Sequence, residues 1–133
     1  MILLDTHVLL WIDRDDAALG LSSRGMIEAA WSEGSVVVNA ITFWEVAMLV
    51  IRGRLELPCD VNLWRSNWLE AGLRELPLDG SISLRAAFLT AFHPDPADRF
   101  LVATAQGIRA TLLTADQAIL SWRGPLTRHD ART

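Results

Sequence analysis

The sequence predicts a single α/β domain over residues 1–133, with a small parallel sheet flanked by helices on both faces. Three observations support this fold class. Short apolar runs typical of buried strands alternate with longer segments that have helical periodicity. The chain is 51% hydrophobic and 21% charged, which indicates a folded globular protein. Its 133 residues suffice for one hydrophobic core but not for two.

The first half of the chain supplies two strands and three helices. The run ILLD and the valine-rich SVVVN predict buried strands, because apolar β-branched residues are bounded by polar ones. Ser22 and Ser23 are expected to cap the second helix, which stops at Gly34, and Gly53 is expected to end the third. In order, we expect strand 2–5, helix 6–13, helix 24–34, strand 35–39 and helix 41–53.

The second half continues the alternation. Residues 54–58 are expected to form an exit loop or an edge. Helix 60–72 is amphipathic, with Leu63, Trp64, Trp68 and Leu69 on one face. We favour core packing for this face over a partner-binding or base-stacking patch. The remaining expectations are strand 73–78, helix 81–92, a helix opening at Asp95, strand 110–114, helix 115–122 and a tail that holds a short strand and then frays.

Charge and cysteine content restrict the class of function. All 12 basic residues are Arg and the net charge is −4, so a broad basic surface that grips nucleic acid is not expected. An acidic site that recruits divalent cations is still compatible with a nucleic-acid substrate. The single cysteine, Cys59, cannot form an internal disulfide, which suits a reducing cytoplasm. We expect no signal peptide, and no membrane span either, because Asn39 and Glu45 interrupt the apolar residues 36–51.

The segment HPDPADRFLVATA, residues 93–105, contains two aspartates that have two competing interpretations. Asp95 is a good N-cap, Pro96 suits the first helical position, and Asp98 faces the positive end of the helix dipole. Helix capping therefore explains the segment on local grounds. The alternative is that these carboxylates serve a chemical reaction.

Four acids are expected at one edge of the predicted sheet. Asp5 ends the first strand, Asp116 follows the strand 110–114, and Asp98 lies in the first turn of its helix. Glu45 stands in an apolar helix, where a carboxylate is costly to bury without a partner or a cation. Capping by Asp5 and Asp116, and ion pairs from Glu45 to Arg52 or Arg54, are the alternatives. In parallel sheets, ligands bind beyond the carboxyl ends of the strands.

The chemistry of this cluster indicates a hard divalent cation. Carboxylates brought together raise each other's pKa unless a cation neutralises them. A site rich in oxygen and poor in histidine suits Mg²⁺ or Mn²⁺, and no Cys/His spacing indicates zinc. Such ions activate water and stabilise the leaving oxygen in phosphodiester hydrolysis.

Four blocks, LLDTHVLLW, FWEVAMLVIRGRLEL, HPDPADRFLVATA and LLTAD, resemble in order and spacing those of PIN-domain proteins, especially VapC-type toxins of toxin–antitoxin pairs. The resemblance spans about residues 2–120. It implies a PIN-like three-layer α/β/α fold and a metal-dependent endoribonuclease. The family's acids fall on Asp5, Glu45, Asp98 and Asp116. The chain departs from the family at Ala97, where a large apolar residue is common, in its use of Arg instead of Lys within residues 50–54, and in lacking a tyrosine near Trp122.

The resemblance also implies roles and partners. Asp5, Glu45, Asp98 and Asp116 would hold Mg²⁺ or Mn²⁺, with RNA as the substrate. Partners would be a VapB-type antitoxin, which inserts a basic side chain into the site, and a second copy of the chain in a homodimer. From the residues themselves, Thr6 and Thr114 either orient the carboxylates or act as ordinary helix caps. Arg99 either braces Asp98, meets phosphate or forms a surface ion pair, and Asp95 is expected to cap its helix beside the site. His7 and His93 are expected to be incidental.

Other functions are weighed against the ribonuclease. Receiver domains cluster acids in a similar fold but need a lysine, and this chain has none. Haloacid-dehalogenase phosphatases want an Asp-x-Asp pair after the first strand and usually a lysine, whereas this chain has Asp-Thr-His there. The remaining alternative is a catalytically silent PIN-fold module that binds RNA or a protein.

Overall fold

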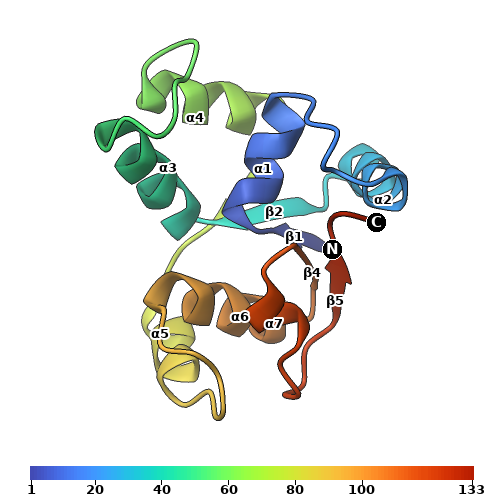
Figure 1. Cartoon of the computed structure of the whole chain (residues 1–133), viewed down its shortest axis with the longest axis vertical. Helices are drawn as coiled ribbons and strands as arrows, with labels where there is room; N and C mark the ends of the chain where they lie inside the picture. Colours follow the sequence, from blue (N-terminus) through green and yellow to red (C-terminus); the bar gives the residue numbers. More distant parts are fainter.

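A five-stranded, fully parallel sheet forms the centre of the molecule (Figure 1). The computed structural model describes all residues, 1–133. The strand order is β3-β2-β1-β4-β5. The strands are β1 (Ile2–Leu4), β2 (Val36–Asn39), β3 (Arg74–Leu76), β4 (Thr111–Thr114) and β5 (Arg128–Asp130). The predicted α/β class and parallel sheet are confirmed.

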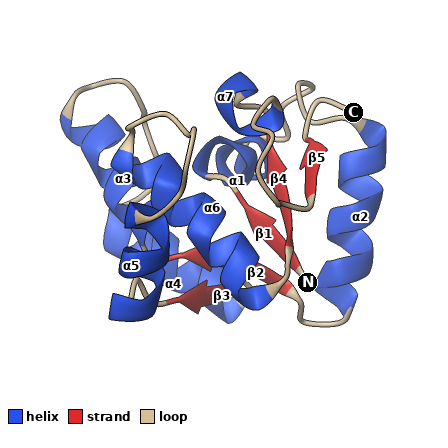
Figure 2. Ribbon diagram, turned by 90° about the horizontal axis from the view of Figure 1, so that it is seen from below, coloured by secondary structure: helices blue, strands red, loops and turns tan.

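Seven helices cover the two faces of the sheet (Figures 1 and 2). In Figure 1, α1 to α4 lie above the sheet, and α5, α6 and α7 lie below it. The helices are α1 (Thr6–Asp13), α2 (Leu21–Ser32), α3 (Ile41–Ile51), α4 (Val61–Glu70), α5 (Gly80–Ala87), α6 (Pro96–Ile108) and α7 (Gln117–Leu120). None of them has the length and hydropathy that a membrane-spanning helix requires.

Each face of the sheet has its own hydrophobic core, because successive side chains of a strand point to opposite faces. Leu4 and Val38 pack with residues of α1, α2, α3 and α4 in the larger core. Leu3 and Val37 pack with α6 and α7 in the smaller one. Strands buried on both faces are continuously apolar, which is why ILL and VVV contain no polar residue.

The chain changes direction across the sheet between β1 and β4. The connections from β1 to β2 to β3 run towards one edge, and β4 and β5 are then added on the other side of β1. A crevice forms beyond the carboxyl ends of the two strands that flank such a switch point, and it is the usual ligand site of parallel α/β sheets. Asp5 follows β1 at this point, and Asp116 follows β4.

The predicted caps of α2 and the frayed tail are wrong. The helix begins at Leu21 after Gly20, and Ser22 and Ser23 lie inside its first turn. The N–H of Ser22 donates to the backbone oxygen of Thr133 at 2.8 Å, so Thr133 caps this helix. A side chain at Gly20 would collide with the backbone of Thr133, which explains the glycine at this position.

Helix α5 ends at Ala87, five residues before the predicted end at residue 92. The guanidinium of Arg99 donates to the carbonyls of Ala86, Ala87 and Leu89. The carbonyls that would receive helical N–H groups in a longer helix are therefore bonded to a side chain. A tertiary contact ends this helix, and no local signal in the sequence marks it.

The predicted apolar face of α4 is right in its centre and wrong at one edge. Trp64 is buried and contacts Phe43 and Trp68 edge-on. Leu63, in contrast, is 52% exposed. The tryptophans of this helix pack in the core and do not form a stacking surface, which agrees with the expected core packing.

Asn39 fixes the start of the helix that carries Glu45. This fully buried residue ends β2, and its Oδ1 accepts the N–H of Ile41 at 2.8 Å. Its Nδ2 donates to Thr104 Oγ1 on α6 at 3.0 Å. One amide thus joins the sheet to helices on both of its faces.

We expect Asn39→Ala to lower the free energy of unfolding by about 2–3 kcal/mol, because it removes the hydrogen bonds to the N–H of Ile41 and to Thr104 at a buried position. Urea denaturation measures this change. Asn67→Ala, at an exposed position of α4, is the matched control and should change the same quantity by less than about 0.5 kcal/mol. Equal effects of the two substitutions would contradict this role of Asn39.

Candidate active site

The four predicted acids line one cavity of about 330 Å³ at the switch point of the sheet. Asp5 comes from the end of β1, Glu45 from α3, Asp98 from the first turn of α6, and Asp116 from the start of α7. The remaining lining residues are Thr6, His7, Leu10, Trp44, Met48, Leu49, Arg52 and Asp95. Four sequence segments therefore bring their carboxylates to one place.

Asp5 is buried and held by three groups. Its Oδ1 accepts the N–H of Thr6 at 2.7 Å and caps α1. Its Oδ2 accepts the hydroxyl of Thr114 at 2.7 Å and lies 3.6 Å from His7 Nδ1. Burial raises the pKa of this carboxyl, and the His7, Thr114 and Thr6 contacts partly offset that rise. The hydroxyl of Thr114 also accepts the N–H of Asp116, at 3.0 Å, so it links the two strand-end acids.

Glu45 is half-buried and oriented by a threonine. Its Oε1 accepts the hydroxyl of Thr6 at 2.7 Å, and that hydroxyl lies 3.1 Å from Thr42 Oγ1. Neither Arg52 nor Arg54 forms an ion pair with it, so that alternative is wrong. Burial raises the pKa of Glu45, and the nearby charges of Asp5 and Asp95 add to the rise.

Asp98, Asp116 and His93 form the tightest group in the cavity region. One ligand atom from each lies within 4.8 Å of the others, the arrangement expected of residues that share a metal ion. His93 Nε2 is 3.1 Å from Asp98 Oδ2. Asp116 uses Oδ1 to cap α7, through the N–H groups of Ala118 and Ile119, and that capping leaves Oδ2 available.

Burial and the neighbouring acids together raise the pKa of Asp98. Burial, followed by the charges of Asp5, Asp95, Asp116 and Glu45, raises its pKa to about 8. A carboxyl with such a pKa is mostly protonated at neutral pH unless a cation joins the cluster. The site is therefore short of positive charge.

Arg99 does not contact Asp98, so the expectation that it braces this acid is wrong. Its guanidinium instead donates to five backbone carbonyls in residues 86–93. Two of these carbonyls belong to Phe92 and His93, at 3.1 and 3.2 Å. Arg99 thereby fastens the loop before α6 and positions His93 indirectly.

Asp95 caps α6, as expected: its Oδ1 accepts the N–H of Ala97 at 3.1 Å. Its carboxylate also lines the acidic cavity, and its charge helps to raise the pKa of Asp98 and of Glu45. For Asp5, Asp95 and Asp116, capping and a position in the cavity go together. A cap occupies one oxygen and fixes the direction of the other.

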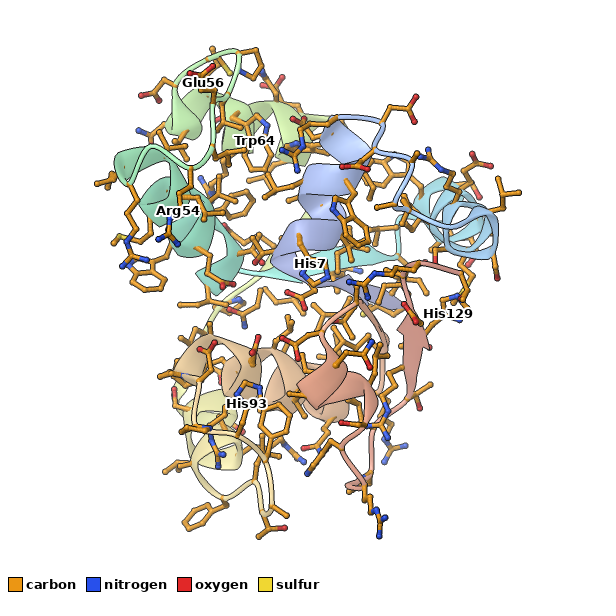
Figure 3. The ribbon with its side chains drawn as sticks, in the orientation of Figure 1. His7, Arg54, Glu56, Trp64, His93 and His129 are labelled. Carbon is orange, nitrogen blue, oxygen red and sulfur yellow. The ribbon has the colours of Figure 1, made fainter.

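His7 and His93, treated as incidental from the sequence, approach the cavity from opposite layers of the fold (Figure 3). His7 Nε2 accepts the N–H of Ala115 at 2.9 Å, which turns its Nδ1 towards Asp5. His93 lies in the loop held by Arg99. Neither histidine belongs to a recognisable spacing, so no signal in the sequence identifies it. The third histidine, His129, lies on β5 away from this cavity (Figure 3).

A larger cavity of about 870 Å³ lies among α5, α6 and the segment after α7. Its walls include Arg85, Phe88, Arg109 and Trp122, but they contain no carboxylate and no histidine. It therefore lacks acid–base and metal-binding groups. Of these two cavities, the smaller, acidic one has the side chains that hydrolysis requires.

The donor set of the acidic cavity fits a hard divalent cation. Its charged ligand groups are carboxylates, with the imidazoles of His7 and His93 beside them, and no thiolate lines it. Mg²⁺ and Mn²⁺ prefer such oxygen ligands. A cation would also relieve the repulsion that adds to the effect of burial on the pKa of Asp98.

Comparison with known proteins identifies the family. The model of the PIN domain matches residues 2–121. Ribonuclease VapC22 of Mycobacterium tuberculosis is 32% identical over 125 residues, which cover 93% of this chain and 93% of that protein.

Solved structures share the fold. VapBC2 from Rickettsia felis, bound to a DNA fragment from its promoter, aligns with a TM-score of 0.70 and 16% identity, over 97% of this chain and 98% of that chain. DNA-bound VapBC from Salmonella typhimurium aligns with a TM-score of 0.68 and 17% identity, over 97% of this chain and 96% of that chain. FitAcB from Neisseria gonorrhoeae aligns with a TM-score of 0.64 and 24% identity, over 98% of each chain. The predicted three-layer PIN-like fold is confirmed.

The raised pKa of Asp98 predicts a stability that depends on pH. The folded chain keeps a proton here up to about pH 8, whereas an ordinary Asp releases it near 3.8. Stability from this group is full below about pH 4 and is lost as the pH rises through 8. We expect Asp98→Asn to raise the melting temperature of the metal-free protein, and to raise it more at alkaline than at acidic pH.

Thermal unfolding in EDTA across this range measures the effect. Asp13→Asn, at an exposed acid in the last turn of α1, is the control and should change the melting temperature little. A difference in melting temperature between Asp98→Asn and the wild type that is the same at every pH would contradict the raised pKa of Asp98.

Proposed function

The chain belongs to the PIN-domain family, and we propose that it is a metal-dependent endoribonuclease, the toxin of a toxin–antitoxin pair. One observation carries the chemical part of this proposal: Asp5, Glu45, Asp98 and Asp116 line a single cavity at the switch point of the sheet. The similarity to Ribonuclease VapC22 supports RNA as the substrate.

Asp5, Asp98 and Asp116 would hold Mg²⁺ or Mn²⁺, with Glu45 as a fourth ligand on the α3 side of the cavity. When bound, such a cation supplies an activated water and charge stabilisation for the phosphodiester undergoing hydrolysis. The carboxylates accordingly serve as ligands and not as independent acids or bases.

The other residues of the cavity orient these ligands. The hydroxyl of Thr114 holds Asp5, and that of Thr6 holds Glu45, each at 2.7 Å. Hydrogen bonds of this kind fix the direction in which a carboxylate presents its free oxygen. The exposed Arg52 lies at the mouth of the cavity and forms no ion pair, so its guanidinium is available to a phosphate of the RNA.

A VapB-type antitoxin is the proposed protein partner. The solved VapBC and FitAB assemblies, which share this fold, pair such a chain with an antitoxin. An acidic cavity with raised carboxyl pKa values favours the insertion of a basic side chain, which would block the site. We further propose a homodimer that acts in the cytoplasm, where the free thiol of Cys59 remains reduced.

A catalytically silent PIN module is the weaker alternative. A protein that only binds RNA has no need to keep four carboxylates in one cavity at the cost of their mutual repulsion. The hydrogen bonds that orient Asp5 and Glu45 are likewise unnecessary for binding alone.

We expect the purified chain to cut total cellular RNA into discrete fragments with Mg²⁺ or Mn²⁺, and not with EDTA. Asp5→Asn should lower the cleavage rate at least about 100-fold, because it removes a charged ligand of the cation. Gel analysis of the fragments measures both effects. Asp13→Asn is the matched control and should cleave like the wild type. Cleavage by Asp5→Asn at the wild-type rate would refute the assignment.

A further inference from the structure

Trp44 differs from the other tryptophans of the chain in two respects. It is 57% exposed, whereas the remaining five are buried or half-buried. Each of those five contacts a second aromatic ring, and Trp44 contacts none. A large exposed indole without a ring partner contributes little to the core, so packing does not account for it.

Trp44 stands between two cavities. It precedes Glu45 on α3 and lines the acidic cavity. It also lines a second cavity of about 270 Å³, between the start of α3 and the start of α6. Asp95 is the other residue common to both. The second cavity is therefore an extension of the candidate active site.

The second cavity is small, and its walls are apolar except for the carboxylate of Asp95. Besides Trp44 and Asp95, its walls are Ile41, Pro96, Ala97 and Phe100. Its volume lies just below the roughly 300–1,000 Å³ that holds a drug-sized ligand, so it suits a single planar ring system. Asp95 uses Oδ1 as a helix cap, and its other oxygen can accept a hydrogen bond.

We propose that this cavity binds one unpaired nucleobase of the RNA, next to the phosphate that occupies the acidic cavity. The base stacks on Trp44, and Asp95 accepts an N–H from its edge. Stacking on aromatic rings is how proteins hold single-stranded nucleic acid. The proposal rests on the ribonuclease function and adds to it a determinant of where the RNA is cut.

The charges around the cavity favour a base over a carboxylate or an isolated phosphate. Asp95 is at its rim, and four further acids line the adjoining cavity, so an anionic group would be repelled. A base is neutral, has N–H donors for Asp95 and presents a flat face to the indole. Its own phosphate is placed beside the acids, where the cation would bind.

Three substitutions separate stacking from folding. Trp44→Ala removes the stacking surface, and Trp44→Phe keeps an aromatic face. Ala97→Phe introduces a ring into the cavity without replacing any carboxylate. Phe88→Ala is the matched control, because Phe88 is 78% exposed and lies outside both cavities.

The first readout is the base preference around the cut, obtained by sequencing the products from a randomised single-stranded RNA pool with Mg²⁺. We expect one position beside the cut to be selective in the wild type and in Trp44→Phe. Trp44→Ala and Ala97→Phe should lose that selectivity and raise KM by about 5- to 100-fold, the range expected for the loss of one stacked base. Phe88→Ala should match the wild type. An unchanged preference in Trp44→Ala and Ala97→Phe would overturn the proposal.

The second readout does not depend on cleavage. The difference in fluorescence between the wild type and Trp44→Phe reports Trp44 alone, because the other five tryptophans are common to both. A short single-stranded RNA should quench this difference signal. The quenching should be smaller when the same difference is taken between Ala97→Phe and the double variant Ala97→Phe/Trp44→Phe. If the wild type cuts no RNA, the ribonuclease function fails, and this quenching still decides for or against the cavity. Absence of quenching, or an effect of Trp44→Ala on antitoxin affinity alone, would overturn the base-binding role.

Discussion

Mutual repulsion among carboxylates at the junction of β1 and β4 is the constraint on which the site depends. The strand order brings Asp5 and Asp116 to this junction, and burial there raises the pKa of Asp5. Each of these residues gives one oxygen to the N-terminus of a helix, where the dipole stabilises negative charge. The helix starts thus offset part of the repulsion and direct the remaining oxygens. At Asp98, burial and the remaining repulsion from the other acids together raise the pKa to about 8.

The part of the site next to α5 and α6 is positioned by tertiary contacts. The five hydrogen bonds of Arg99 hold residues 86–93 against the start of α6, and they end α5 early. The same loop brings His93 to Asp98. On the other side of the cavity, Asn39 sets the start of α3 and hence the positions of Trp44 and Glu45. The hydrogen bonds of Arg99 and Asn39 therefore position both the acidic cavity and the apolar cavity beside it.

Much of the fold was predictable because local signals agree with the topology. Apolar runs marked the strands of a sheet buried on both faces, and Asp95 and Pro96 marked the start of α6. The four acids were predictable as a group, since strand ends and helix starts meet at one edge of a parallel sheet. The contributions of Arg99, His93 and Trp44 were not. They depend on which loop carbonyls face a guanidinium and which helix face stays uncovered, and no periodic pattern encodes either.

The central claim is that these carboxylates share a divalent cation. Crystals grown with Mn²⁺ and measured for anomalous scattering at the manganese absorption edge test it most directly. The account predicts an anomalous peak inside the acidic cavity, at bonding distance from oxygens of Asp98, Asp116 and Asp5. A well-ordered cavity with no peak at saturating Mn²⁺, or a peak only at carboxylates elsewhere on the surface, would contradict it.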